Sequence, residues 1–300
     1  MLETGNVSDV ERLACFIASI NGNKQQHVGY CGVKAEGILE DLKNDFSDIP
    51  LDYSFVAAYE NGEMVGAVGV DIDKETKTAE IWGPFVHHAD WEKVSMAMWK
   101  QLLKQLPISL DRAFGFYNIY NSRCAGFMEQ LGAERKERED VILQIIREEW
   151  KVSKEGIAGI TEMTEMTAEY FDAFRKLHQE AFPNGYYRAD EIIEKLDDKN
   201  RVFLATESGT FAGYVYCEAD PELCEADIHF ISVCPDARNN GWGRKLISKS
   251  VDFLFSFKEI NEIILCVDAS NATAIRIYKN AGFTPLHQLA FFVLPLAAEE

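Results

Sequence analysis

Residues 233–245, VCPDARNNGWGRK, combine residue types that bind anions. Arginine and lysine supply positive charge, glycine lets a ligand approach the backbone closely, and asparagine tolerates left-handed backbone angles. An amphipathic helix is expected after this turn, and a helix start presents unpaired N–H groups and the positive end of the helix dipole. The residues concerned are Arg238, Asn239, Asn240, Gly241, Gly243, Arg244 and Lys245. The turn therefore predicts a site for a phosphate-like anion, with an ordinary glycine-containing loop as the alternative.

Hydrophobic patterning predicts the elements that hold this turn. Residues 225–233, EADIHFISV, are expected to form the strand before it, and residues 262–268, EIILCVD, form a continuous apolar run typical of a strand buried on both faces. A short helix at residues 271–282 and a last strand at residues 286–294 follow. The apolar stripe of the helix directly after the turn consists of Leu246, Ile247, Val251, Leu254 and Phe255. With two helices and two further strands before the turn, residues 157–295 are expected to form one mixed α/β unit.

The two halves of the chain resemble each other. Residues 55–73 match residues 202–220, and each stretch predicts two strands joined by a tight turn, at Gly62 or at Gly209. Asn121 begins a segment, NSRCAGFMEQLGA, that matches the segment beginning at Asn271. We therefore expect two copies of one unit, residues 1–150 and residues 151–300, with the join in the charged stretch 147–156, REEWKVSKEG.

Composition excludes several classes of function. The 300 residues include 49 acidic and 30 basic side chains, a net charge of -19, which argues against nucleic acid or an anionic membrane as a partner. No apolar stretch approaches the roughly 20 residues of a spanning helix, and the N-terminus lacks the pattern of a secretory signal. Seven cysteines without a CxxC pair suggest neither a zinc site nor a disulfide framework. We expect a reduced, cytoplasmic protein without a metal ion.

Two motifs resemble those of the GNAT superfamily of N-acetyltransferases. Residues 238–243, RNNGWG, resemble the family's Gln/Arg-x-x-Gly-x-Gly/Ala acyl-CoA loop, and residues 271–283, NATAIRIYKNAGF, resemble its Asn-x-x-Ala-x-x-x-Tyr-x-x-x-Gly-Phe segment. The motifs stand in the family's order, and the resemblance covers residues 157–295 and, more faintly, residues 1–150. It implies an α/β (α+β) fold with a mixed sheet, built from two tandem GNAT-like acyl-CoA N-acyltransferase units.

The resemblance also implies acetyl-CoA as co-substrate and assigns roles in the second copy. Backbone amides from Arg238 to Arg244 would hold the pyrophosphate, and Asn271 would lie near the pantetheine. Tyr278 would approach the thioester sulfur as general acid, the alternative being a core aromatic residue. The expected cofactor-binding residues are Ile231, Val233, Arg238, Asn239, Asn240, Gly241, Trp242, Gly243, Arg244 and Asn271.

Amine acylation needs a base, because the attacking amine must be neutral. Asp227 aligns with the glutamate that serves as general base in histone-type members of the family. His229 lies one pleat nearer to the thioester-binding end and is the other candidate, directly or through a water molecule. Strand residues two apart share a face, so both are expected to point the same way as Ile231 and Val233. Either side chain could instead face solvent or complete a local hydrogen bond.

The acceptor is expected to be a small-molecule or peptide amine. The predicted hairpin at residues 217–227, CEADPELCEAD, is rich in carboxylates and would attract a cationic amine, although a solvated turn explains it equally well. The sequence leaves the identity of the amine, the acyl chain length and the oligomeric state open.

The first copy departs from the family pattern. Its counterpart of the phosphate loop, VHHADWEKV at residues 86–94, has no glycine and places Asp90 and Glu92 where a phosphate would lie. Met128 stands at the position of Tyr278. We expect this degenerate copy to have lost CoA binding.

The leading hypothesis is an acetyl-CoA-dependent N-acetyltransferase in which the amine attacks the thioester directly in a ternary complex. One alternative is a non-catalytic acyl-CoA-binding or regulatory module, in which both copies have lost turnover. Another is an enzyme like mycothiol synthase, which also has a tandem GNAT layout and whose acceptor is a cysteine-bearing aminosugar.

Overall fold

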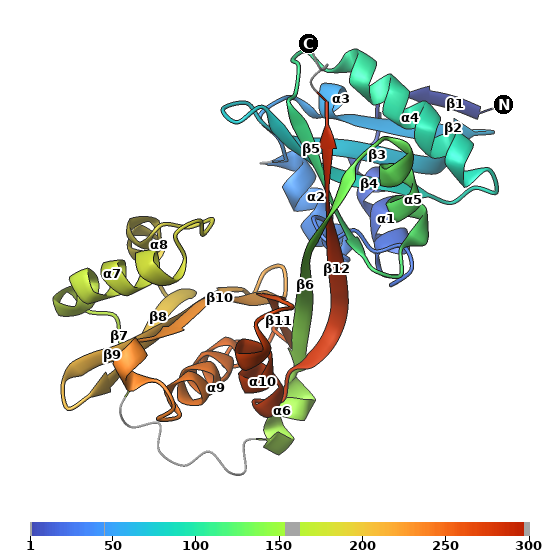
Figure 1. Ribbon diagram of the computed structural model, residues 1–300. Helices are drawn as coiled ribbons and strands as arrows, with labels where there is room; N and C mark the ends of the chain where they lie inside the picture. The colour runs from blue at the N-terminus through green and yellow to red at the C-terminus, as the bar shows by residue number, and fades with distance from the viewer. Residues whose placement is uncertain (1, 45, 154–162, 297–300) are drawn as a thin grey trace. The chain divides into compact units, whose positions relative to one another are not determined.

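The structure is a computed structural model that describes residues 2–44, 46–153 and 163–296. Its contacts divide the chain into two units: residues up to Asp140 together with the chain from His287 onward, and residues from Val141 to Leu286. In each unit, helices cover both faces of a sheet (Figure 1). The predicted mixed α/β fold with two repeated units is confirmed. Within the described ranges, no helix combines the length and apolar character that crossing a membrane requires.

The first unit has the strand order β1-β2-β3-β4-β5-β12. Strands β4 and β5 run parallel, and the other pairs are antiparallel. Its elements are β1 (Leu2–Gly5), α1 (Val10–Asn21), α2 (Ala35–Lys43), α3 (Leu51–Ser54), β2 (Phe55–Glu60), β3 (Glu63–Asp73), β4 (Thr78–Val86), α4 (Trp91–Gln105), β5 (Arg112–Asn118) and α5 (Ser122–Gln130).

The second unit has the strand order β11-β10-β9-β8-β7. Strands β10 and β11 run parallel, and the others pair antiparallel. Its elements are α6 (Arg147–Ser153), β7 (Met163–Glu165), the 3-10 helix η1 (Ala168–Tyr170), α7 (Phe171–Ala181), α8 (Ala189–Lys195), β8 (Asn200–Glu207), β9 (Thr210–Asp220), β10 (Glu225–Val233), the 3-10 helix η2 (Pro235–Ala237), α9 (Trp242–Leu254), β11 (Glu262–Asp268) and α10 (Ala272–Asn280).

Two long strands connect the units. β6 (Glu134–Ile146) begins in the first unit and ends in the second, whereas β12 (Thr284–Pro295) runs the other way. The C-terminal strand, expected from the sequence at the end of the second copy, therefore pairs with β5 of the first unit, from Leu289 opposite Asn118 to Pro295 opposite Arg112. The stretch 147–156, where the join was expected, begins α6; its residues 154–156 lie outside the described ranges.

The two tight turns predicted at glycine are present. Gly62 (φ 82°) follows Asn61 (φ 51°) between β2 and β3, and Gly209 (φ 81°) follows Ser208 (φ 52°) between β8 and β9. Two successive positive φ angles characterise the type I′ turn, whose twist matches that of a β-hairpin. The repeated sequence pattern thus produces the same hairpin in both units.

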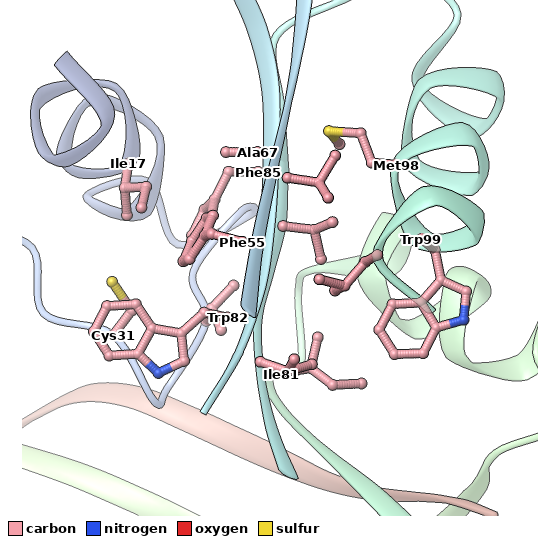
Figure 2. Close-up of a cluster of buried hydrophobic side chains, with 14 of the residues drawn as sticks. Ile17, Cys31, Phe55, Ala67, Ile81, Trp82, Phe85, Met98 and Trp99 are labelled. Atoms are coloured by element: carbon pink, nitrogen blue, oxygen red, sulfur yellow. The ribbon is translucent and has the colours of Figure 1, made fainter. Parts of the chain in front are cut away.

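The core of the first unit covers both faces of its sheet. Figure 2 shows Ile17 of α1, Phe55, Trp82 and Phe85 on one face, and Met98 and Trp99 of α4 on the other. The second unit has one apolar cluster beneath α9 and α10 and another beneath α7 and α8. In that unit the predicted stripe of α9 is buried, with Leu246, Val251 and Leu254 fully covered.

Candidate active site

The anion-binding turn of the second unit has the backbone conformation that its sequence suggests. After η2 the chain adopts positive φ angles at Asn239 (66°) and at Gly241 (80°), and Gly241 is the N-cap of α9. The tolerance of asparagine and glycine for left-handed angles is therefore used at both positions. A Cβ atom at Gly241 would meet no protein atom within 4 Å, so the turn opens onto free space.

A run of backbone donors lies in this turn. The N–H of Arg238 bonds to the carbonyl of Pro235, and the N–H of Lys245 bonds to the carbonyl of Gly241. In the described structure, the backbone N–H groups of residues 239–244 have no protein acceptor, and no side chain caps α9. Six successive N–H groups at a helix start are thus available to an anion.

The turn borders a cavity of about 420 Å³. The end of β10 forms one wall, and α9 and α10 form the others. The predicted residues that line it are Ile231, Val233, Arg238, Asn239, Gly241, Trp242, Gly243, Arg244, Asn271 and Tyr278; Asn240, Asp227 and His229 are not among its lining residues. The cavity is large enough for part of a CoA molecule, and its donors suit a pyrophosphate rather than a cation.

Two of the lining residues also have local roles. The side-chain oxygen of Asn271 accepts from the N–H of Ala274 at 3.0 Å and so caps α10, as Asn121 caps α5 in the first unit. This capping bond explains why both copies carry the asparagine. The Arg238 side chain donates through Nε to the carbonyl of Val233 at 3.2 Å. A ligand amide that binds this carbonyl must therefore share it with Arg238.

Tyr278 lies on α10 with only 6% of its surface exposed and borders the cavity. Burial raises the pKa of its hydroxyl, which keeps the proton in place at neutral pH. In the described structure no protein group hydrogen-bonds this hydroxyl. Packing against Phe283, with ring centroids 5.7 Å apart, fixes the ring. Tyr278 is thus both a core aromatic residue and a lining residue of the cavity.

A β-bulge at His229 changes which residues share a face. Ile228 pairs with Cys217 and Phe230 pairs with Tyr216, which leaves His229 without a partner in the ladder. The prediction that Asp227 and His229 point the same way as Ile231 and Val233 is therefore wrong. Asp227 lies opposite Glu218 on the face beneath α7 and α8, whereas Ile231 and Val233 pack with the cluster beneath α9.

On the α7–α8 face, His229 is held by hydrogen bonds from both sides. Its Nδ1 lies 2.7 Å from the hydroxyl of Tyr186, and its Nε2 lies 3.1 Å from Oε2 of Glu218. Tyr216 donates its hydroxyl to the other carboxylate oxygen, and the Lys195 ammonium lies 3.6 Å from it. Burial alone would raise the pKa of Glu218, but the bonds from His229 and Tyr216 lower it to about 2. Glu218 is therefore ionised at neutral pH.

The acidic hairpin does not present a row of free carboxylates. Asp220 accepts from the N–H groups of Glu222 and Leu223 and so builds the turn. Glu222 lies 3.3 Å from the Lys199 ammonium, and Glu218 belongs to the His229 network. These internal bonds weaken the expectation that the hairpin attracts a cationic acceptor.

The first unit lacks the features that open the cavity in the second. Pro84, which lies 147 residues before Ile231, has no N–H to offer a ligand. Tyr117 is fully buried between β4 and β5 and bonds to the carbonyl of Gly83. A hollow of about 670 Å³ remains, but its lining comes from residues 89–93 and from α5, with Asp90 and Glu92 at the helix start. Lys93 and Arg123 also line this hollow.

Sequence patterns did not indicate Tyr186, Tyr216 or Lys195. Tyr186 lies between α7 and α8, and Gly185 lets this segment approach Phe230, since an added Cβ would lie 3.3 Å from the Phe230 ring. The stretch NGYYR offers a turn signal at Gly185 but nothing that connects it to a histidine 43 residues later.

Comparison with known proteins agrees with this geometry. Residues 167–283 match the model of the acetyltransferase (GNAT) family. A mycothiol acetyltransferase of Thermobispora bispora is 31% identical over 87 residues, 27% of this chain and 29% of that protein. One of Streptomyces griseus is 28% identical over 95 residues, 32% of this chain and 31% of that protein. The chain thus spans about three tenths of the length of these curated relatives.

Solved structures resemble the whole chain. A GCN5-related N-acetyltransferase from Sphaerobacter thermophilus has a TM-score of 0.71 at 16% identity, covering 100% of this chain and 97% of that one. A tandem GNAT protein from the clavulanic acid biosynthesis pathway has a TM-score of 0.66 at 16% identity, with 100% of both chains covered. Residues 167–283 are therefore a domain of the GNAT acetyltransferase family, and the chain that carries them has the fold of a tandem GNAT protein.

Proposed function

We propose that the protein is an acetyl-CoA-dependent N-acetyltransferase whose chemistry takes place in the second unit. The observation that carries this proposal is the cavity bordered both by the six unpaired N–H groups of residues 239–244 and by the hydroxyl of Tyr278. A pyrophosphate would bind the N–H groups, because the helix start and Arg244 both favour an anion. The acetyl group would then lie toward Tyr278 and the end of β10.

In this proposal, the acceptor amine attacks the thioester carbonyl directly. Tyr278 would protonate the departing sulfur as the C–S bond breaks, a role that its protonated hydroxyl supports. Asp227 and His229 are the candidates for the base. A covalent acetyl-cysteine at Cys234 has little support, because burial raises the pKa of that thiol and so disfavours the nucleophilic thiolate. The proposal includes a cytoplasmic location, as expected from the cysteine pattern, and no metal ion.

The acceptor is proposed to be a primary amine on a small molecule or a peptide. The matches to mycothiol acetyltransferases favour one specific candidate, a cysteine-bearing aminosugar. Because those matches cover less than a third of either protein, this acceptor is one member of a panel rather than the assigned substrate.

The test combines binding with turnover. Calorimetric titration with acetyl-CoA should give saturable binding. Thiol release from acetyl-CoA should then be measured across polyamines, amino acids, aminoglycosides, peptides and a cysteine-bearing aminosugar. Tyr278→Phe should lose at least about tenfold in kcat with unchanged acetyl-CoA affinity. Tyr170→Phe is the matched control, since the Tyr170 hydroxyl bonds to the carbonyl of Gly209 and Tyr170 is not a lining residue of the cavity.

Three outcomes separate the hypotheses. Turnover that depends on Tyr278 supports the enzyme. Saturable binding without thiol release for any amine favours the non-catalytic acyl-CoA module. Absence of binding contradicts both.

A further inference from the structure

Five aromatic side chains gather around the bulge of β10 in the second unit. The Tyr186 ring packs against Phe230 at a tilt of 35° with ring centroids 4.9 Å apart, and the ring of Tyr216 stacks on His229 at 5.7 Å and 30°. The ring centroids of Tyr187 and His229 lie 5.8 Å apart, and the Lys195 ammonium donates a hydrogen bond of 2.8 Å to the Tyr187 hydroxyl. The imidazole is therefore fixed in its orientation, and the side chain of His229 is only 18% exposed.

The hydrogen bonds determine where the protons of this network lie. Glu218 is ionised, so its carboxylate only accepts, and Nε2 of His229 must carry a hydrogen. In the neutral ring Nδ1 is then the acceptor, and the Tyr186 hydroxyl must donate to it. Tyr186 is 65% exposed, and the bond to Nδ1 uses the hydrogen of its hydroxyl and leaves the oxygen lone pairs free to accept.

The network lies on β10 next to the point where β10 and β11 separate. Asp227 opposite Ile264 is the one ladder pair that joins β10 to β11 in the described structure. Beyond it the strands are unpaired, and the cavity wall begins at Ile231. His229 lies between these two residues, so an acetyl group that enters the gap between the strands would approach the face that carries His229 and Tyr186.

We infer that Tyr186 and His229, with Glu218 as a positioning residue, form a relay that takes the proton from the acceptor amine. The inference rests on the proposed function and adds to it the group that contacts the amine. Tyr186 is the catalytic residue that touches the substrate, His229 is the base, and Glu218 holds the ring and stabilises its charged form.

One proton of the ammonium passes to the oxygen of Tyr186 as the Tyr186 hydroxyl proton passes to Nδ1 of His229, and the imidazolium later releases it to solvent. The neutral amine attacks the carbonyl carbon, so that the C–N bond forms and the C–S bond breaks. Tyr278 protonates the sulfur, and the second proton lost by the amine restores the Tyr278 hydroxyl.

Charged and titratable groups approach the relay from every neighbouring element. They are Tyr186 and Tyr187 from the segment before α8, Lys195 from α8, Tyr216 and Glu218 from β9, Asp227 from β10 and Cys266 from β11. Glu218 and Tyr186 bond directly to the imidazole nitrogens. The pH dependence of the relay should therefore respond first to Glu218.

The first test needs neither coenzyme nor acceptor. Two-bond ¹H–¹⁵N correlation spectra of the ¹⁵N-labelled protein at pH 8 should give His229 as the Nε2–H tautomer, with Nδ1 unprotonated. Glu218→Gln should mix the tautomers. A wild-type ring protonated at Nδ1 would overturn the relay, because His229 would then donate to Tyr186 instead of accepting from it.

The second test is kinetic and uses the amine from the panel that gives the fastest thiol release. Tyr186→Phe, which keeps the ring on Phe230, should lower kcat by at least about tenfold, and His229→Gln by about a hundredfold. Tyr170→Phe is the matched control, because the Tyr170 hydroxyl bonds to the carbonyl of Gly209 outside this network, and it should stay within about twofold of the wild type. A Tyr186→Phe rate equal to that of Tyr170→Phe overturns the inference.

The role of Glu218 is tested by the pH profile of kcat/KM. Glu218→Gln removes the negative charge that stabilises the imidazolium, so the acidic limb should move to lower pH by about one unit. Glu218→Asp keeps the charge and should return the limb toward the wild-type position. An unmoved limb in Glu218→Gln contradicts the positioning role.

The two proposals fail in different ways. Absence of acetyl-CoA binding, or of thiol release with every amine, counts against the proposed function, and the tautomer then decides alone whether the relay geometry exists. Normal turnover in the wild type together with an active Tyr186→Phe variant counts against the relay alone.

Discussion

The Tyr117 hydroxyl donates a hydrogen bond of 2.9 Å to the carbonyl of Gly83, and this bond joins β5 to β4 where the first unit would otherwise open a gap. The Sγ atom of Cys124 contacts the neighbouring carbonyl of Pro84 at 3.7 Å. In the second unit the corresponding strands, β11 and β10, pair at Ile264 and Asp227 and separate beyond this pair. The Tyr117 side chain thus closes the gap between the two strands in the first unit, whereas the corresponding gap in the second unit stays open.

We predict one acetyl-CoA site per chain. The first unit combines the buried Tyr117, which leaves a pantetheine arm no gap, with Asp90 and Glu92 at the start of α4. These two carboxylates offset the positive charges of Lys93 and Arg123, which line the same hollow, and so disfavour a pyrophosphate there. Calorimetric titration should give a stoichiometry of one. A second site of similar affinity would show that the first unit binds the coenzyme despite its closed strands.

Gly241→Ala should weaken acetyl-CoA binding specifically. Gly241 (φ 80°) and Gly209 (φ 81°) have the same left-handed backbone, and an added Cβ would meet no atom within 4 Å at either position. Alanine should therefore cost about 1–2 kcal/mol of unfolding free energy at both sites. Only at Gly241 does the methyl group enter the cavity, so calorimetry should give at least about tenfold weaker binding for Gly241→Ala and wild-type affinity for Gly209→Ala. Equal affinities would mean that the phosphates bind elsewhere.

Arg147→Met should destabilise the second unit by about 3 kcal/mol. The guanidinium donates to the carbonyls of Phe255, at 2.6 Å, and of Ile260, at 2.9 Å, and also to that of Phe257. Methionine would leave these carbonyls at the end of α9 without a charged donor. Urea unfolding, followed by hydrogen exchange of the backbone amides of β11 and α9, measures this loss of stability.

The matched control for this change is Arg175→Met. Arg175 bonds to Asp172 and Asp190, whose side chains are largely exposed, and exposed ion pairs contribute less than about 1 kcal/mol. Equal losses for the two variants would contradict the role assigned to Arg147.

The sequence predicts the cavity well because its walls follow from local patterns. The start of α9 requires residues that tolerate positive φ, and Asn239 and Gly241 are such residues. The bulge at His229 could not be predicted, since HFIS is compatible with a regular strand and only the pairing with β9 shifts the register. The Tyr186–His229 bond joins segments 43 residues apart and has no local signal.

The sequence also does not predict that the long strands β6 and β12 each pass from one unit to the other. Residues 286–294 are apolar enough to pair with any neighbouring strand, so their pattern predicts a strand but not its partner. Arg147, which the sequence placed in a linker between the copies, instead anchors the loop after α9.

Stability of the first unit should fall as the pH rises from 5 to 8, because Asp71 and Glu80 face each other across β3 and β4. Burial, reinforced by neighbouring carboxylates, raises the pKa of Asp71 to about 6 and that of Glu80 to about 7. Both values exceed those of the unfolded chain, near 4, so between about pH 4 and 7 the folded state binds more protons and loses stability as they leave. Glu80→Gln removes one titrating group and should reduce this loss, whereas Glu75→Gln on the exposed hairpin should not. Urea unfolding at pH 5 and pH 8 measures this loss, with tryptophan fluorescence as the signal. In a Trp150→Phe, Trp242→Phe background the signal comes from Trp82, Trp91 and Trp99 of the first unit. If Glu80→Gln left the stability difference between pH 5 and pH 8 unchanged, the raised pKa values of the carboxyl pair would be contradicted, because the pair would then titrate alike in the folded and the unfolded state.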